Sequence, residues 1–297
     1  MLMSRKLKNP NTDTYAMKPI IITHGGVGCP PENKDGTDKA AKVGFEILEK
    51  GGSALDAVEA AIVILEDDPR FNAGYGSFLR LDGSIEMDAI IMDSEGSCGA
   101  VAAIKDVKNP ISIARKVMTT PHILLVGEGA VDFARREGFQ KFDPKTEKAI
   151  KKLAEYKEKI KTNDLPEWAD KWKEFKYCDT VGAVAVDRQG KFAAGSSSGG
   201  IPIALKGRVG DSALVGCGAF AGEHGAVTPT GVGEEIIRKV LSKSVYDRIV
   251  DGLTPQEACE WGMGLFDPNI PMGIIAISRD GFGITATNDM AWSVLKG

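Results

Sequence analysis

The sequence predicts an α+β fold in which antiparallel strands are combined with amphipathic helices. Short runs of β-branched and small apolar residues recur along the chain, and segments with helical apolar spacing lie between them. In addition, several strand runs are separated by turn pairs such as Asp82-Gly83, which join antiparallel neighbours. With 297 residues, the chain is long enough to bury a sizeable core.

In the first half of the chain, strands and helices are mixed. Residues 1–17 are polar and basic and predict a disordered tail, with Met17 as an alternative start. Helices are predicted where apolar residues recur with helical spacing, and strands where β-branched runs end at glycines. In chain order we expect a strand at 20–23 stopped by His24-Gly25-Gly26, helices at 38–50 and 54–65, a hairpin of strands at 77–81 and 85–93, a strand at 100–104, a helix at 110–118, a strand at 122–126 and a helix at 130–137.

The composition changes twice in the second half. Residues 141–179 alternate Lys and Glu around a weak helical stripe, which predicts a solvated, partly helical and flexible connector. The run TVGAVAV at 180–186 then predicts a buried strand, with a turn at 187–190 and a returning strand at 192–195. Beyond it we expect helices at 234–249 and from Pro255, and strands at 272–278 and 283–287.

The composition is that of an ordinary globular protein. Apolar residues make up 43% and charged residues 26%, and 37 Lys and Arg against 41 Asp and Glu give a formal net charge of −4. We therefore expect no nucleic acid and no membrane as partner. Since the five cysteines are scattered and form no C-x-x-C pair, they predict reduced thiols and a cytoplasmic protein.

Three common kinds of site are not predicted. The three histidines lack the spacing of a zinc site. Gly127-Glu128-Gly129 follows a strand and opens a helix, but Asp132 stands where a dinucleotide fingerprint needs its third glycine. The run at 195–199 only superficially resembles the G-x-S-x-G turn of serine hydrolases.

Hydroxyl residues beside glycines remain as candidate nucleophiles. A hydroxyl needs a nearby base, and an α-amine with a pKa of about 7.7 to 8.0 would serve if the hydroxyl residue stood at a chain terminus. Asp179-Thr180 lies between the charged connector and a buried strand, so cleavage there would remove nothing from the core. By itself such a pair means little, because Asp13-Thr14 is another with no strand behind it.

Several motifs together resemble one family over roughly residues 18–295. The chain is similar to the plant-type asparaginases, or isoaspartyl aminopeptidases, which belong with glycosylasparaginase and threonine aspartase among the N-terminal nucleophile hydrolases. The resemblance is carried by His24-Gly25-Gly26, Ala54-Leu55-Asp56-Ala57-Val58, Phe71-Asn72-Ala73-Gly74, the run 178–185, Ser196-Ser197-Ser198-Gly199-Gly200, Gly207-Arg208-Val209-Gly210-Asp211-Ser212 and Thr230-Gly231-Val232-Gly233-Glu234.

The resemblance implies a fold and an assembly. The fold is a four-layer αββα sandwich, one globular domain made of an α subunit that ends at residue 179 and a β subunit over 180–297. The two subunits arise when Thr180 attacks the Asp179 carbonyl carbon and the chain cuts itself. Two such pairs associate into an (αβ)2 heterotetramer.

The resemblance also implies roles for site residues. Thr180 is the nucleophile and supplies the base through its α-amine, Ser198 orients it, and Thr230 with the Gly231 N–H holds the oxyanion. Substrate-binding positions are Arg208 for an α-carboxylate, Asp211 for an α-ammonium, and the neighbouring Val209, Gly210, Val232, Gly233 and Asn72. Without the motifs, Arg208 and Asp211 would be interpreted as a surface ion pair of little energetic weight.

The implied chemistry needs no organic cofactor, and a structural sodium ion is the one inorganic ligand that the resemblance suggests. Its loop would contain Leu65, Glu66, Phe71 and Ala73, and oxygen donors suit such an ion. The alternative interpretation is that the carboxylates of Glu66, Asp67 and Asp68 end a helix in water.

The expected reaction is hydrolysis of L-asparagine to aspartate and ammonia, and of β-aspartyl dipeptides, through a β-aspartyl-enzyme ester. Three positions depart from the family pattern, since Ser198 and Val232 replace common threonines and Ala213 a common proline. Glycosylasparaginase and an aspartate-specific threonine protease are the alternative enzymes. An uncleaved, inert binding or scaffold protein is the alternative outside enzymes.

Overall fold

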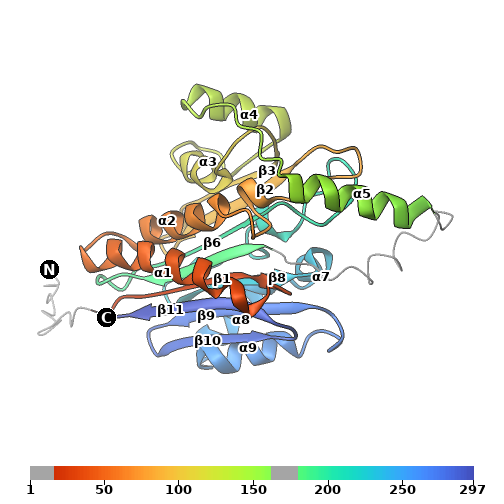
Figure 1. Ribbon diagram of the computed structural model, residues 1–297. Coiled ribbons are helices and arrows are strands. Elements are labelled where there is room, and N and C mark those ends of the chain that lie inside the picture. Colours follow the sequence, from red (N-terminus) through yellow and green to blue (C-terminus); the bar gives the residue numbers. More distant parts are fainter. Residues whose placement is uncertain (1–16, 162–179) are drawn as a thin grey trace, which may run out of the picture.

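In the computed structural model, which describes residues 17–161 and 180–297, two β-sheets lie against each other with helices beside both (Figure 1). The larger sheet has the strand order β11-β1-β5-β6-β2-β3-β4, and the smaller one has the order β10-β9-β8-β7. All neighbouring strands are antiparallel except β3 and β4.

The strands of the described residues are β1 (Ile20–Val27), β2 (Met87–Asp93), β3 (Cys98–Ile104), β4 (Leu124–Val126), β5 (Val181–Val186), β6 (Phe192–Ser198), β7 (Phe220–Gly222), β8 (Gly225–Gly231), β9 (Met272–Ser278), β10 (Gly281–Ala286) and β11 (Met290–Lys296). The α-helices are α1 (Lys34–Glu49), α2 (Ala54–Asp67), α3 (Pro110–Val117), α4 (Gly127–Arg136), α5 (Glu147–Lys161), α7 (Gly233–Lys239), α8 (Leu241–Val250) and α9 (Pro255–Met263).

Three apolar clusters fill the spaces between these elements. Because successive side chains of a strand point to opposite faces, Ile21 of β1 belongs to the cluster beneath α1 and α2, whereas Ile22 belongs to the cluster between the sheets. In β9, Ile275 likewise lies between the sheets, and Ile274 packs with residues of α8 and α9. Helices therefore cover the outer face of each sheet, and the two inner faces contact each other through pairs such as β5 and β8.

Most predicted elements are confirmed, but the strand predicted at 77–81 is wrong. Its backbone groups bond to loops, since Phe78 N donates to Asn72 Oδ1 at 3.0 Å and Ile203 N donates to Leu79 O at 3.1 Å. The true partners of β2 are β3 and β6, which occupy both of its edges. No edge of β2 is left for the segment at 77–81, so the predicted hairpin does not form.

The helix predicted at 234–249 is also wrong, because it is two helices. Val240 between α7 and α8 has φ of +47°, which ends one helix and redirects the chain into the next. The break lets Lys243 N donate to Gly216 O at 2.9 Å and places Leu241 in the apolar cluster beneath the smaller sheet.

This break carries a stability prediction. A β-branched residue in the left-handed region is strained, and glycine is not. We expect Val240→Gly to raise the free energy of unfolding by about 0.5 to 1 kcal/mol, measured by urea denaturation. A lower denaturation midpoint would show that the Val240 side chain, which is half exposed, packs more favourably than its backbone is strained.

Some strands are longer than predicted, and others were not predicted. β1 continues through His24 to Val27 and does not stop at Thr23, because Val27 still pairs with Met290 of β11 after an irregularity in register. β7, β8 and β11 were not predicted; β8 carries Pro229 and is flanked by glycines, which hides a strand pattern.

α5 supplies the helical part of the predicted connector, whereas residues 1–16 and 162–179, including Asp179, lie outside the described residues. Within the described ranges, no helix combines the length and apolar character needed to span a membrane.

Candidate active site

Thr180 and Ser198 meet where two neighbouring strands begin and end. Thr180 directly precedes β5, and Ser198 is the last residue of its antiparallel neighbour β6. The Thr180 side chain is 4% exposed, and its Oγ1 donates to Ser198 Oγ at 3.1 Å. Ser198 Oγ also accepts from Gly200 N at 3.0 Å, which fixes its position. The two hydroxyls that the motifs singled out are therefore in contact.

The backbone at Thr180 is strained. Its φ of +36° is an outlier for a β-branched residue, and such conformations cost about 1 to 3 kcal/mol unless the surroundings enforce them. Strain of this kind clusters at functional sites. Here it lies at the residue predicted to cut the chain.

His24 lies beside Thr180, and sequence reasoning assigned it no catalytic duty. His24 is buried and pairs with Gly182 across β1 and β5, where a Cβ atom on Gly182 would come within 2.3 Å of His24 Nε2. Glycine is therefore required at 182 to admit the imidazole. Burial lowers the pKa of His24 to about 3, so the ring is neutral. The neighbouring Thr180 main chain raises this pKa, but by less than burial lowers it.

Thr230 and Gly231 lie at the end of β8, in the sheet that faces β5. Thr230 is buried, and its Oγ1 accepts from Val27 N at 3.2 Å. Because the hydroxyl accepts this bond, its own hydrogen can be donated elsewhere. The structure thus places a hydroxyl donor beside β1, close to the segment that carries His24.

Arg208 and Asp211 are brought together around Gly233. The Arg208 side chain is 12% exposed and forms a two-pronged ion pair with Glu234, from Nε to Oε1 at 3.0 Å and from Nη2 to Oε2 at 2.9 Å. A Cβ atom on Gly233 would lie 2.9 Å from both Arg208 Nη2 and Asp211 Oδ1. The alternative of a surface ion pair between Arg208 and Asp211 does not hold, because Asp211 is buried and the partner of Arg208 is Glu234.

The charges in this cluster are not fully balanced. Asp211 Oδ2 is buried without a hydrogen-bond partner in the described part of the chain. Burial raises the pKa of Asp211 to about 7, and the positive charge of Arg208 opposes the rise. A buried carboxylate in need of a partner suits a cationic ligand group. Val209 and Gly210 form the backbone between the two charged residues, and Val232 directly precedes α7.

Asn72, predicted to bind substrate, uses its groups within the protein. Its Nδ2 donates to Gly200 O at 2.6 Å, and its main-chain oxygen accepts from Gly199 N at 2.9 Å. Its Oδ1 accepts from Phe78 N at 3.0 Å. Asn72 thus supports the segment that follows Ser198.

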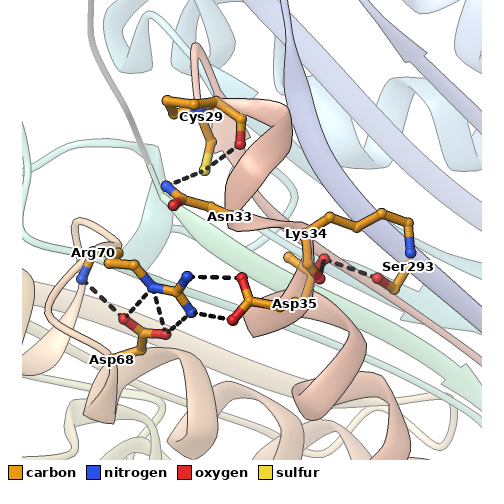
Figure 2. Close-up of polar contacts among 9 residues, drawn as sticks. Cys29, Asn33, Lys34, Asp35, Asp68, Arg70 and Ser293 are labelled. Carbon is orange, nitrogen blue, oxygen red and sulfur yellow. Dashed lines mark hydrogen bonds and ion pairs between the residues drawn. The ribbon is translucent and has the colours of Figure 1, made fainter.

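In the predicted sodium loop, the expectation that Glu66 ends a helix in water is wrong. Glu66 is buried, and its Oε1 accepts from Ser197 Oγ at 2.6 Å and from Ile111 N at 3.0 Å. Burial raises its pKa to about 8. Asp68 instead meets Arg70, which also holds Asp35 at the start of α1 (Figure 2).

The main chain of this loop fits the predicted ion chemically. A Cβ atom on Gly74 would lie 2.5 Å from Glu66 O, and one on Gly76 would lie 1.9 Å from Phe71 O, so glycine is required at both positions for the main chain of this loop to pack closely. Together with the carbonyls of Leu65 and Ala73, those of Glu66 and Phe71 are hard oxygen donors, as sodium requires. Over residues 17–161 and 180–297, no cluster of three or more His, Cys, Asp or Glu side chains could hold a metal ion.

Comparison with known proteins agrees with these motifs. Residues 17–296 match the family described as asparaginase. The chain belongs to the asparaginase family. It is 44% identical to plant-type L-asparaginase of Pyrococcus abyssi over 294 residues, 93% of this chain and 96% of the relative. It is 39% identical to isoaspartyl peptidase/L-asparaginase of Xenopus laevis over 292 residues, 94% and 93% of the two chains. The human protein of that name is 40% identical over 297 residues, 94% of each chain.

Membership of the asparaginase family makes this chain a hydrolase, as predicted. The sequence analysis gave no individual role to two residues of the candidate site, Glu234 and His24. Glu234 was quoted only as part of a motif, although a carboxylate one residue after Gly233 could have been matched to Arg208. For His24, the signal that could have been used was its position at the end of a buried apolar run. Burying an imidazole without a hydrogen-bond partner costs free energy, so a buried histidine there calls for an explanation.

Proposed function

We propose that this asparaginase-family chain cuts itself between Asp179 and Thr180 and hydrolyses L-asparagine and β-aspartyl dipeptides. The observation that carries the proposal is the buried contact of 3.1 Å between Thr180 Oγ1 and Ser198 Oγ at the strained start of β5. The names of the relatives, which combine L-asparaginase and isoaspartyl peptidase, support the same pair of substrates.

Maturation uses the Thr180 hydroxyl. Thr180 Oγ1 attacks the Asp179 carbonyl carbon, the peptide C–N bond breaks, and the acyl group is left as an ester on the threonine oxygen. Breaking the C–N bond frees the α-amine of Thr180, which takes the proton of the hydroxyl. Water then hydrolyses the ester, which returns the hydroxyl and separates the two chains. Release of the strained φ favours the cut.

Turnover uses the same oxygen. The freed amine accepts the hydroxyl proton as Oγ1 attacks the side-chain carbonyl carbon of the substrate. Ammonia or an amino acid leaves with that proton, and water then releases aspartate from the ester. Thr230 Oγ1 and Gly231 N–H donate to the developing oxyanion, and one such donor contributes about 3 to 4 kcal/mol to lowering the barrier.

Arg208 and Asp211 hold the charged ends of the substrate. Glu234 occupies the Nε and Nη2 edge of the guanidinium, which leaves the edge formed by Nη1 and Nη2 for the α-carboxylate. Asp211, with its unpartnered Oδ2, pairs with the α-ammonium. Fixing both ends orients the side-chain carbonyl toward Thr180.

We also propose that the fold is the αββα sandwich of N-terminal nucleophile hydrolases and that the mature protein is a cytoplasmic (αβ)2 heterotetramer. The order of the layers, with two stacked sheets between two layers of helices, supports the sandwich. Cys98, Cys217 and Cys259 are free and buried, which suits a reducing compartment. The assembly is supported by the family resemblance.

The reaction is tested by incubating the purified protein with L-asparagine, β-aspartyl-leucine, glycosylasparagine and a protein substrate. Release of aspartate from the first two supports the proposal. Release only from glycosylasparagine, or cleavage only of the protein after aspartate, would establish one of the alternative hydrolases. Denaturing electrophoresis tests the scaffold alternative, since a self-cleaving chain gives two bands and an inert one gives a single band.

The raised pKa of Asp211 predicts how substrate binding depends on pH. The carboxyl is ionised above pH 7 and protonated below it, and only the ionised form pairs with an α-ammonium. We therefore expect KM for asparagine to rise about 10-fold as the pH falls from 8 to 6. Steady-state kinetics over this range check it, with Asp211→Asn as the control, for which KM is high and constant. A wild-type KM independent of pH would contradict the role of Asp211.

A further inference from the structure

Beneath the loop at 207–211 lies a group of charged side chains that the proposed reaction does not use. Arg80, Glu86 and Asp88 are buried, although charged residues are seldom buried without partners. All three precede the proposed cleavage point, whereas the loop follows it. They come from the segment that leads into β2 and from β2 itself.

Glu86 and Arg80 hold the first part of the loop by its main chain. Gly207 N donates to Glu86 Oε2 at 2.6 Å, and Arg80 Nη2 donates to Arg208 O at 3.0 Å. Arg80 Nη2 also donates to Glu86 O at 3.1 Å. The Glu86 carboxylate is itself paired with Lys105 Nζ at 3.0 Å. The charges therefore compensate one another while they fix two main-chain groups of the loop.

Asp88 holds the last part of the loop from a bulge between β2 and β3. Pairing shifts between Met87 opposite Ile104 and Ala89 opposite Val101, so the chain is irregular opposite Asp88. The bulge leaves Ala103 at φ of +48°, and its N–H donates to Asp88 Oδ1 at 2.8 Å. The other carboxylate oxygen, Oδ2, accepts from Gly210 N at 3.1 Å.

Asp88 therefore joins two features of the site. Across the sheet it pairs with Ser198, the contact of Thr180. Through Gly210 N it sets the backbone directly before Asp211. Gly207 N, Arg208 O and Gly210 N are thus all engaged from below. Asp211 Oδ2 and the edge of Arg208 that Glu234 does not occupy are then held in place for a ligand.

We infer that Asp88, supported by Arg80 and Glu86, is a positioning residue that fixes the loop at 207–211 so that Arg208 and Asp211 meet the two charged ends of the substrate. The inference rests on the proposed binding roles of Arg208 and Asp211. A displacement of about 1 Å in such a loop is enough to misplace a substrate. Asp88 contacts no substrate itself; it acts through Gly210.

Asp88→Asn tests the inference, because it preserves volume and replaces one of two accepting oxygens by an amide donor. One of the two N–H groups, on Ala103 or Gly210, then faces another donor. Asp187→Asn is the matched control. Asp187 is 3% exposed, and it accepts from Ala54 N at 3.1 Å and from Gln189 N and Lys191 N at 3.0 Å, at the opposite end of β5.

The measurements are KM and kcat for asparagine, the Kd of L-aspartate by calorimetry, and the urea midpoint. For Asp88→Asn we expect KM and Kd to rise about 10- to 100-fold, the cost of losing a buried bond to a charged group, with kcat changed by less than about 3-fold. For Asp187→Asn we expect a lower urea midpoint with KM and Kd within about 2-fold of wild type. Self-cleavage should be unchanged in both.

Unchanged KM and Kd in Asp88→Asn, or an equal rise in Asp187→Asn, would overturn the inference and leave Asp88 a purely structural residue. If Asp88→Asn does not fold, Glu86→Gln replaces it, since this change removes the charge that pairs with Lys105 beneath the same loop. The same rise in KM and Kd is then expected, and unchanged values overturn the inference. Failure of the proposed function is distinguishable, because wild type would release no aspartate from any substrate, whereas the Kd of L-aspartate still reports on the loop.

Discussion

Replacing Thr180 by alanine should leave the chain in one piece and abolish release of aspartate. The hydroxyl is the attacking group in both steps, and no other hydroxyl in the described site directly precedes a buried strand next to the proposed cut. Loss of a nucleophile costs about 10⁴-fold or more in turnover. Intact mass spectrometry should give one species for Thr180→Ala and two fragments for wild type, and an aspartate assay should give background for the variant.

Ser196→Ala provides the matched control for this experiment. Ser196 lies on β6 two residues before Ser198, is buried, and has an Oγ without a partner in the part of the chain that the structure describes. Its removal should leave both cleavage and turnover near wild type. Aspartate release by Thr180→Ala, or a fully active wild type that remains one chain, would refute the proposed mechanism.

The second large effect is expected for Arg208→Lys. Lysine keeps the positive charge but loses the planar fork that pairs with Glu234 and, in the proposed complex, with the substrate carboxylate. Since hydrogen bonds to charged groups contribute about 1.5 to 3 kcal/mol each, we expect kcat/KM for asparagine to fall about 100- to 1000-fold, mostly through KM. Steady-state kinetics on the cleaved protein measures it.

Arg70→Lys is the control for Arg208→Lys, because it makes the same substitution at an ion-paired arginine outside the proposed substrate site. The guanidinium of Arg70 also forms ion pairs, with Asp35 at the start of α1 and with Asp68 directly after α2 (Figure 2). The Arg70 side chain is more exposed than that of Arg208. Because exposed ion pairs contribute little, we expect kinetics close to wild type. Equal losses in the two variants would mean that Arg208 acts through stability and does not bind the substrate.

The sequence alone identified the features that depend on neighbouring residues. The apolar run after residue 179, its turn at 187–190 and the returning strand follow from local alternation and turn chemistry, and β5 and β6 pair as predicted. The charged connector and the abrupt start of β5 made Asp179-Thr180 a candidate cleavage site, and the family resemblance then pointed to Thr180 as the nucleophile. The family resemblance pointed to Arg208 and Asp211, and the structure places them around Gly233.

Other local patterns were misleading because the decisive partner is distant in the chain. Glycines and Pro229 concealed β8, which forms because β9 supplies a continuous antiparallel partner. The apolar pattern at 234–249 reads as one helix, and only packing beneath the smaller sheet shows why the chain turns at Val240.

Local sequence thus determined the strand that directly follows Thr180 and the residue types available for chemistry, since turns, periodicity and motifs are properties of neighbours. Tertiary structure decided which charges are buried and what they pair with. Glu66 lies inside the protein, Glu234 faces Arg208, and Asp88 reaches Gly210 across 122 positions of sequence. The physical reason is that desolvation and hydrogen bonding depend on everything packed around a group, and segments far apart in the chain provide most of those surroundings.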